Sequence, residues 1–154
     1  MAAPTMSHII CSMALVALIF VLPSFYSVIV NNIEAEVITK ELQEITDYTS
    51  STIENLYFLV NSTASQEVLL EKKLINLPSI VEESIYVLKL TEVDGAVINV
   101  TAFLKYQPTV GATSWIVPGL KLSEKNVVIE SSDKSVITGC EKNATGVYVW
   151  IRYD

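Results

Sequence analysis

Residues 9–30 read IICSMALVALIFVLPSFYSVIV, a stretch of 22 positions without Asp, Glu, Lys or Arg. At about 1.5 Å per residue, a helix of this length spans the roughly 30 Å of hydrocarbon in a bilayer. The stretch therefore predicts a transmembrane helix behind a short leader at residues 1–8. A secretory signal peptide is the alternative, but the basic n-region and A-x-A-like cleavage site of such peptides are not present in good form.

Several residues near or inside this span have simple interpretations. Pro23 removes one helix hydrogen bond and is expected to bend the helix. Small side chains at Ser12, Ala14 and Ala17 would let neighbouring helices approach closely. Cys11 is interpreted as a packing thiol in preference to a lipid attachment site, and His8 as an interfacial residue in preference to a proton site.

The orientation of the span is inferred from the residues on its C-terminal side. Three N-x-S/T sequons stand at Asn61, Asn99 and Asn143, all beyond the apolar stretch. Acidic residues also lie close behind the span, at Glu34 and Glu36. We therefore expect a single-pass protein of the cell membrane whose C-terminal body lies outside the cell, with these three asparagines as candidate glycosylation sites.

Residues 31–61 are predicted to continue the helix with an amphipathic pattern. Apolar or small residues recur in steps of three and four, which places them on one helical face. The positions are Ile38, Leu42, Ile45, Thr49, Ile53, Leu56 and Val60. This face needs a partner, either the chain's own downstream domain or helices of neighbouring copies. The first alternative is favoured for its second half, because residues 47–52 are polar.

Residues 62–154 are predicted to form a small extracytoplasmic β domain. Six β-rich runs read as strands, at residues 67–75, 84–92, 96–106, 125–130, 135–140 and 147–153. Asp94-Gly95 predicts a hairpin turn, whereas Pro108, Gly111, Pro118 and Gly119 are expected to interrupt the middle of the domain. The predicted fold class is therefore α+β, a long N-terminal helix followed by an antiparallel sheet or sandwich.

Two aromatic groups in this domain invite a binding interpretation. Trp115 is expected in a loop at residues 111–119, where it would be a candidate for contact with a partner. Tyr148 and Trp150 alternate with aliphatic residues in the last predicted strand. Core packing beneath a helix is favoured for this pair over binding of a sugar or a partner.

Composition argues against several function classes for this chain. Ten basic and seventeen acidic residues give a net charge of −7, which disfavours nucleic acid as a partner. The one histidine, His8, flanks the membrane, so we expect no histidine-dependent catalysis in the body. Cys140 has no second thiol beyond the span, and Glu82-Glu83 lacks calcium-loop spacing. We expect no enzyme, no cofactor and no metal.

The order of these features resembles the archaeal type IV pilin-like proteins, archaellum-type and accessory subunits included. The features that carry the resemblance are Ser7-His8-Ile9-Ile10, Pro23, the stretch 35–60, and Leu74-Ile75-Asn76-Leu77-Pro78. The resemblance implies peptidase cleavage of a short leader, a filament core of bundled helices, and β domains outside. It also implies an alternative role, as a permanently membrane-anchored accessory module that contacts the surface layer.

Overall fold

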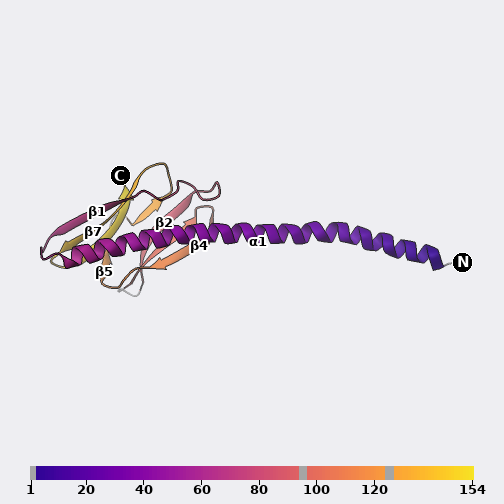
Figure 1. Ribbon diagram of the computed structural model, residues 1–154, viewed down its shortest axis with the longest axis horizontal. Coiled ribbons are helices and arrows are strands. Elements are labelled where there is room, and N and C mark those ends of the chain that lie inside the picture. The colour runs from indigo at the N-terminus through magenta and orange to yellow at the C-terminus, as the bar shows by residue number, and fades with distance from the viewer. Residues whose placement is uncertain (1–2, 94–96, 124–126) are drawn as a thin grey trace. The chain divides into compact units, whose positions relative to one another are not determined.

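The computed structural model describes residues 3–93, 97–123 and 127–154 of the chain. One helix is followed by strands, in the order α1 (Ala3–Ser62), β1 (Val68–Leu74), β2 (Tyr86–Val93), β3 (Val97–Leu104), β4 (Gln107–Trp115), β5 (Leu120–Leu122), β6 (Val128–Glu130), β7 (Val136–Asn143) and β8 (Gly146–Tyr153) (Figure 1). The predicted α+β class is confirmed. The chain divides into two units, Met1–Val37 and Ile38–Asp154.

Helix α1 ends where hydroxyl side chains bond to its last free carbonyl groups. Ser62 Oγ donates a hydrogen bond to the carbonyl oxygen of Leu59 at 2.9 Å, and Thr63 Oγ1 donates to the same oxygen at 2.8 Å. Because the last four carbonyls of a helix have no partner within it, these side chains satisfy one of them, the carbonyl of Leu59. The helix, predicted to run to residue 61, therefore ends within the sequence Asn61-Ser62-Thr63.

The strands form two four-stranded sheets, ordered β1-β7-β8-β5 and β4-β3-β2-β6. All neighbouring strands of the described residues are antiparallel except β5 and β8, which are parallel. Tyr153 connects the sheets, because its hydroxyl accepts a hydrogen bond from the Glu130 amide at 2.9 Å and donates to the Glu130 carbonyl oxygen. The C-terminal part of α1 lies along the strands (Figure 1).

Each of the six predicted strands has a counterpart in the structure, but the middle of the domain differs from the prediction. The expected interruption at residues 107–119 contains β4, and the short β5 was also missed. Pro108 is tolerated because β4 is an edge strand. The β5–β8 pair is parallel, so the first sheet is mixed and not antiparallel. The Asp94-Gly95 turn lies outside the described residues, although the strands on either side of it pair antiparallel.

A bulge explains why β4 contains a glycine. The register between β3 and β4 shifts between Phe103 and Leu104. A Cβ atom on Gly111 would lie 2.8 Å from the Ala102 carbonyl oxygen and 3.0 Å from the Phe103 Cβ. The irregularity lies in β4, whose residues 108–110 have no register partner among the described residues, and Gly111 lets β4 lie close to β3 directly beside it.

The apolar face of α1 is buried by the sheets of its own unit. Leu42, Ile53 and Val60 are fully inaccessible to solvent, and they share one core with Val100 and Val149 of the two sheets. This burial removes the apolar stripe from water, which is the main favourable term in folding. The stripe is therefore covered within the chain, as the favoured alternative predicts.

Small hydroxyl residues allow the strands to pack closely on the helix. Thr46, Thr49 and Thr52 of α1 are buried together with the apolar stripe. Thr49 Oγ1 donates to the Ile45 carbonyl oxygen at 2.8 Å, so its burial leaves no hydroxyl unsatisfied. The polar stretch 47–52, which weakens a coiled coil, is thus compatible with helix–sheet packing.

Trp150 covers the outer face of the first sheet by lying over a glycine. A Cβ atom added to Gly139 would overlap the Trp150 ring, and the Arg152 guanidinium carbon lies 4.6 Å from the centre of that ring. Trp150 is only 8% exposed. The expected burial of Trp150 is confirmed, but the expected place is wrong, because Trp150 packs on the outer face against Gly139 and Arg152 and does not belong to the core that α1 covers.

Replacing Leu42 by Ala is expected to lower the free energy of unfolding by about 2–5 kcal/mol, because it leaves a cavity between α1 and the sheets. Leu59→Ala is the matched control on the same helix, since Leu59 is 58% exposed. Chemical denaturation of the full chain in detergent measures both changes. Equal losses for the two variants would contradict the described burial of the stripe.

Gly139→Ala is expected to destabilise the chain by about 1–3 kcal/mol, because the added methyl group overlaps the Trp150 ring. In a Trp150→Leu background the same substitution is expected to cost less, since the ring is gone. Denaturation of the four proteins in this double-mutant cycle measures the coupling. Additive effects would show that the ring does not restrict residue 139.

Candidate functional site

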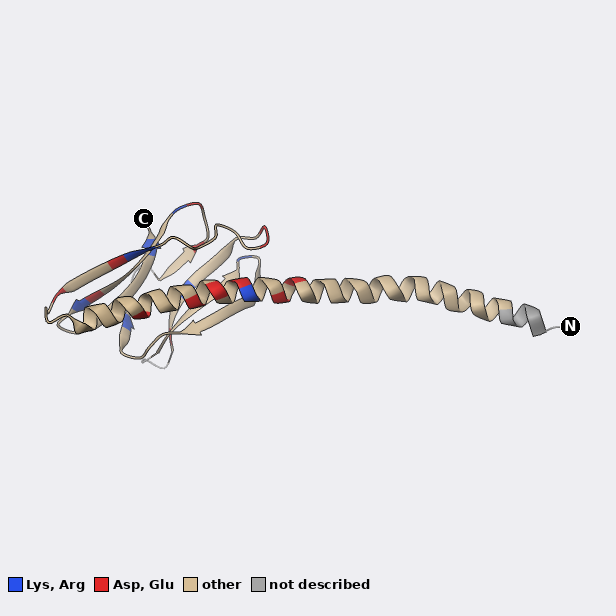
Figure 2. Cartoon of the chain, viewed as in Figure 1, with Lys and Arg blue, Asp and Glu red and all other residues tan. Residues whose placement is uncertain are grey.

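The first candidate site is the exposed apolar segment of α1. Every side chain from His8 to Ile29 is exposed, and large apolar residues such as Ile9 (60% exposed) and Phe20 (71%) occupy all sides of the helix. Figure 2 shows no charged residue in this part of the described helix. A helix that is apolar around its whole circumference requires a lipid or protein environment. This helix is long and apolar enough to cross a membrane.

Pro23 lies inside the helix, and α1 continues through it. Proline has no amide hydrogen, so the carbonyl group four residues earlier loses its helical donor. The next residue bonds locally, because Ser24 Oγ donates to the Phe20 carbonyl oxygen at 3.0 Å. This keeps the polar group of Ser24 satisfied inside an apolar segment.

The small residues of the span do not form one continuous face. Ala14 and Ala17 are three residues apart and share a face. Ser12 and Pro23 share another face. At about 100° per residue, Ala14 lies about 200° around the helix from Ser12, so the two faces are on opposite sides. All four are exposed in this chain. A close helix contact would therefore use either the Ala14 and Ala17 face or the opposite one.

The other packing candidates lie in the unit Ile38–Asp154, called the β-bearing unit from here on. Leu42, Ile45, Ile53 and Leu56 are at most 5% exposed, and Ile38 packs at the margin of the same core. These side chains already contact their own sheets, so they are not available to a neighbouring copy.

A polar seam joins α1 to the edge strand β4. Gln43 Nε2 donates to Asp47 Oδ1 at 2.8 Å and to Ser114 Oγ at 3.0 Å, and Ser114 Oγ donates to Asp47 Oδ1. Further along, Glu54 Oε1 accepts the Val117 amide at 3.2 Å. These side chains bond to one another, so the seam fixes β4 on the helix and presents no open catalytic arrangement.

The three sequons lie in different structural settings. Asn61 is exposed near the C-terminal end of α1. Asn143 ends β7 at a hairpin turn, where its Oδ1 accepts hydrogen bonds from the Thr145 amide at 2.9 Å and the Thr145 hydroxyl at 2.6 Å. Asn99 lies within β3 and is half-buried. Their glycosylation remains a prediction.

Trp115 is an exposed aromatic residue, but it does not lie in a loop. It is the last residue of β4, and its side chain is 63% exposed. The sequence interpretation was wrong about the element because the proline and glycine of β4 were treated as interruptions. The residue remains a candidate contact, now on a sheet and opposite Asn99 in register.

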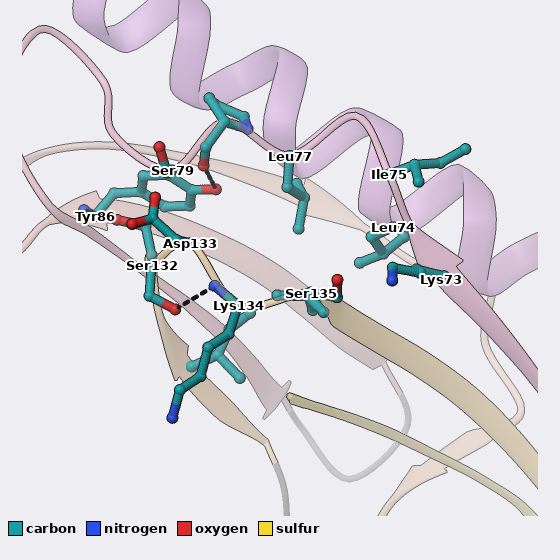
Figure 3. A pocket seen from close by; sticks show the side chains of 14 residues that line it. Lys73, Leu74, Ile75, Leu77, Ser79, Tyr86, Ser132, Asp133, Lys134 and Ser135 are labelled. Carbon is teal, nitrogen blue, oxygen red and sulfur yellow. Dashed lines mark hydrogen bonds between the residues drawn. The ribbon is translucent and has the colours of Figure 1, made fainter. Parts of the chain in front are cut away.

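A cleft of about 300 Å³ lies between residues 73–79 and residues 131–136 (Figure 3). Tyr86 lines it and donates its hydroxyl hydrogen to the Pro78 carbonyl oxygen at 2.8 Å, while its amide donates to Ser131 Oγ at 3.0 Å. Burial, with a smaller effect from Tyr153, raises the pKa of Tyr86 above its ordinary value. Tyr86 is therefore a neutral residue that holds the loop, a structural role missed by the sequence interpretation.

Cys140 is buried in the core between β7 and α1. Its Sγ lies 3.8 Å from the Ile53 carbonyl oxygen. Burial raises the pKa of the Cys140 thiol from 9.0 to about 12. Since the thiolate is the reactive form, this residue behaves as a small buried apolar side chain.

A long N-terminal apolar helix together with β-sheets packed on its C-terminal part is consistent with a type IV pilin-like fold. No family model matches the chain, and no curated protein or solved structure matches it either. The fold and the apolar segment therefore carry the functional argument.

In a Cys11→Ser variant, Cys140 is expected to resist thiol reagents at pH 8, because a pKa of about 12 leaves about one thiol in ten thousand ionised. Unfolding in guanidinium should restore ordinary reactivity. The folded pKa is the higher one, so the associated stability is full below about pH 9 and declines as the pH rises toward 12. Rapid labelling of the folded variant at pH 8 would contradict the burial of the thiol.

Proposed function

We propose that this chain is a structural pilin-like subunit of an archaeal cell-surface filament, assembled through residues 9–30. In this proposal the β-bearing unit lies outside the cell, and the protein has no enzymatic activity. Like subunits and membrane lipid are its partners, and nucleic acid is not.

The observation that carries this proposal is the contrast between the two parts of α1. In residues 38–60 one stripe of the helix is apolar, and it is covered by the sheets of the same chain. In residues 8–29 apolar side chains face all directions and are exposed. Residues 8–29 therefore need an apolar environment other than the core of the β-bearing unit. Bundled helices or lipid would supply it.

An apolar segment of this kind can exchange contacts with lipid for contacts with other helices. Lipid tails are as apolar as the helix surface, so helix association in a membrane depends on close packing of side chains. Ala14 and Ala17 offer a face on which two backbones can approach closely. The same segment would therefore serve first as an anchor and then as a filament core.

The alternative is a permanently anchored accessory module that contacts the surface layer. The exposed Trp115 and Tyr106, 63% and 77% exposed, favour a contact role for the β-bearing unit. Aromatic residues are enriched in protein interfaces.

Shearing the cells that produce the protein separates the two roles. A filament subunit is expected in sedimenting fibres released without detergent, and an anchor stays in the membrane pellet. Mass spectrometry of the N-terminus gives a second readout, because cleavage near Ser7 supports assembly and an intact Met1 supports tethering. Recovery of a soluble form that begins after Val30 would contradict both roles.

The Ala14→Leu/Ala17→Leu variant tests the contact face. It keeps the segment apolar but blocks close approach, so we expect the protein to remain in the membrane and the yield of fibres to fall. Leu18→Ile is the matched control, because it keeps the volume of an exposed apolar residue. Normal fibre yield from the double variant would show that this face is not the contact.

A further inference from the structure

Asn99 and Trp115 lie next to each other on the outer face of the β4-β3-β2-β6 sheet. The two residues are direct partners in the antiparallel β3–β4 register. Side chains of directly opposite residues project from the same face, with Cβ atoms about 4.5–5.5 Å apart. A sequon asparagine therefore has an indole ring as its immediate neighbour, although sixteen positions separate them in the chain.

Burial shows which face this is. Ile98 and Val100, which flank Asn99 in β3, are buried in the core, so Asn99 projects to the opposite side. Trp115 is 63% exposed on that side. It differs in this from Tyr86 and Trp150, two other aromatic residues of the chain, which are buried. The Trp115 ring offers an apolar surface that the described residues leave largely uncovered.

Hydroxyl groups occupy the next positions on the same face. Thr101, the third residue of the Asn99 sequon, faces Thr113 of β4, and their Oγ1 atoms lie 3.3 Å apart. Thr91 of β2 is the other cross-strand partner of Asn99. An indole ring beside hydroxyl groups suits a sugar, which presents both C–H and hydroxyl groups.

Asn99 itself contributes little to the sheet. Asparagine is disfavoured in strands, where β-branched residues pack better. Its Oδ1 atom is buried and lacks a hydrogen-bond donor among the described residues. An unsatisfied buried acceptor opposes folding. A role outside the packing of the sheet would account for an asparagine at this position.

We propose that an N-linked glycan on Asn99 lies over Trp115 and shields its ring. Attachment forms a bond between Asn99 Nδ2 and the anomeric carbon of a phosphate-activated oligosaccharide. The carbon–oxygen bond to the phosphate breaks, the phosphate leaves with the electron pair, and one Nδ2 proton passes to a base of the transferase. The first sugars then place their C–H groups against the indole face.

This inference rests on the outward placement in the proposed function, and it separates Asn99 from the other two sequons. Asn61 lies near the end of α1 and Asn143 lies in a turn. Glycans at these positions would extend from the termini of elements, whereas the Asn99 glycan would cover a sheet face. The exposed ring of Trp115 would then be the surface on which the Asn99 glycan lies.

Mass spectrometry of the full chain from its own cells tests attachment at each sequon. Trypsin cleaves after Lys40, Lys72, Lys89, Lys105, Lys142 and Arg152, so residues 41–72, 90–105 and 143–152 carry one sequon each. A sugar mass on residues 90–105 supports the proposal. An unmodified Asn99 overturns it, whatever the state of the other two peptides.

Acrylamide quenching of tryptophan fluorescence tests the stacking. Trp150 is buried, so most quenching reports on Trp115, and a Trp115→Phe variant gives the remaining signal. We expect Asn99→Gln to raise the quenching constant about twofold, because one face of the ring is uncovered. Asn143→Gln is the matched control, which removes a distant sequon and should leave the constant unchanged.

The outcomes separate this inference from the proposed function. A modified Asn99 with unchanged quenching in Asn99→Gln overturns the stacking but leaves the outward placement intact. Sedimenting fibres that contain chains unmodified at Asn99 overturn the proposed glycan over Trp115 and leave the proposed function intact. An unchanged far-ultraviolet circular dichroism signal in Asn99→Gln shows that the sheet remains folded, so increased quenching in that variant supports the proposal.

Discussion

The burial of one helical stripe under two sheets is the constraint on which the rest of the fold depends. Leu42, Ile53 and Val60 can leave water only if strands from both sheets reach the same helix. The small hydroxyl residues Thr46 and Thr49 permit that approach, because their side chains are short and Thr49 bonds to the helix backbone. The stripe therefore determines which face of each sheet is apolar. On the opposite faces, Trp150 is already covered by its own sheet and Arg152, whereas Trp115 is exposed and remains for other contacts.

The sequence predicts those elements whose signals are local. A period of three to four residues identifies the helix, and runs of β-branched residues identify the six strands. Strand β4 was missed because Pro108 and Gly111 interrupt such a run, although an edge position tolerates the proline and the close approach of β3 favours the glycine. Strand β5 is three residues long and pairs in parallel with β8, which lies more than twenty residues later. No local pattern encodes such a pair.

The candidate sites also divide into features with a local sequence signal and features that depend on residues far apart in the chain. The apolar segment 9–30 and the sequons can be read directly from the residues, since each signal is contained in a short stretch. The position of Asn99 beside Trp115 depends on a strand that the sequence hides and on a register shifted by a bulge. The structural role of Tyr86 also depends on distant residues, because its partners Pro78 and Ser131 belong to separate loops. Long-range pairing is therefore what sequence reasoning could not supply.

The complete core of the β-bearing unit bears directly on the proposed assembly. A subunit whose sheets were left half-covered would need neighbouring β domains to fold, and assembly would then be coupled to folding. Here the stripe of α1 and both sheets already close one core within a single chain. The apolar segment is consequently the part whose surface the core leaves uncovered, and under the proposed function lipid would cover it before assembly and like helices after it. Under the proposed function, the outer sheet faces can then vary in their contacts or their glycans without affecting how the helices pack.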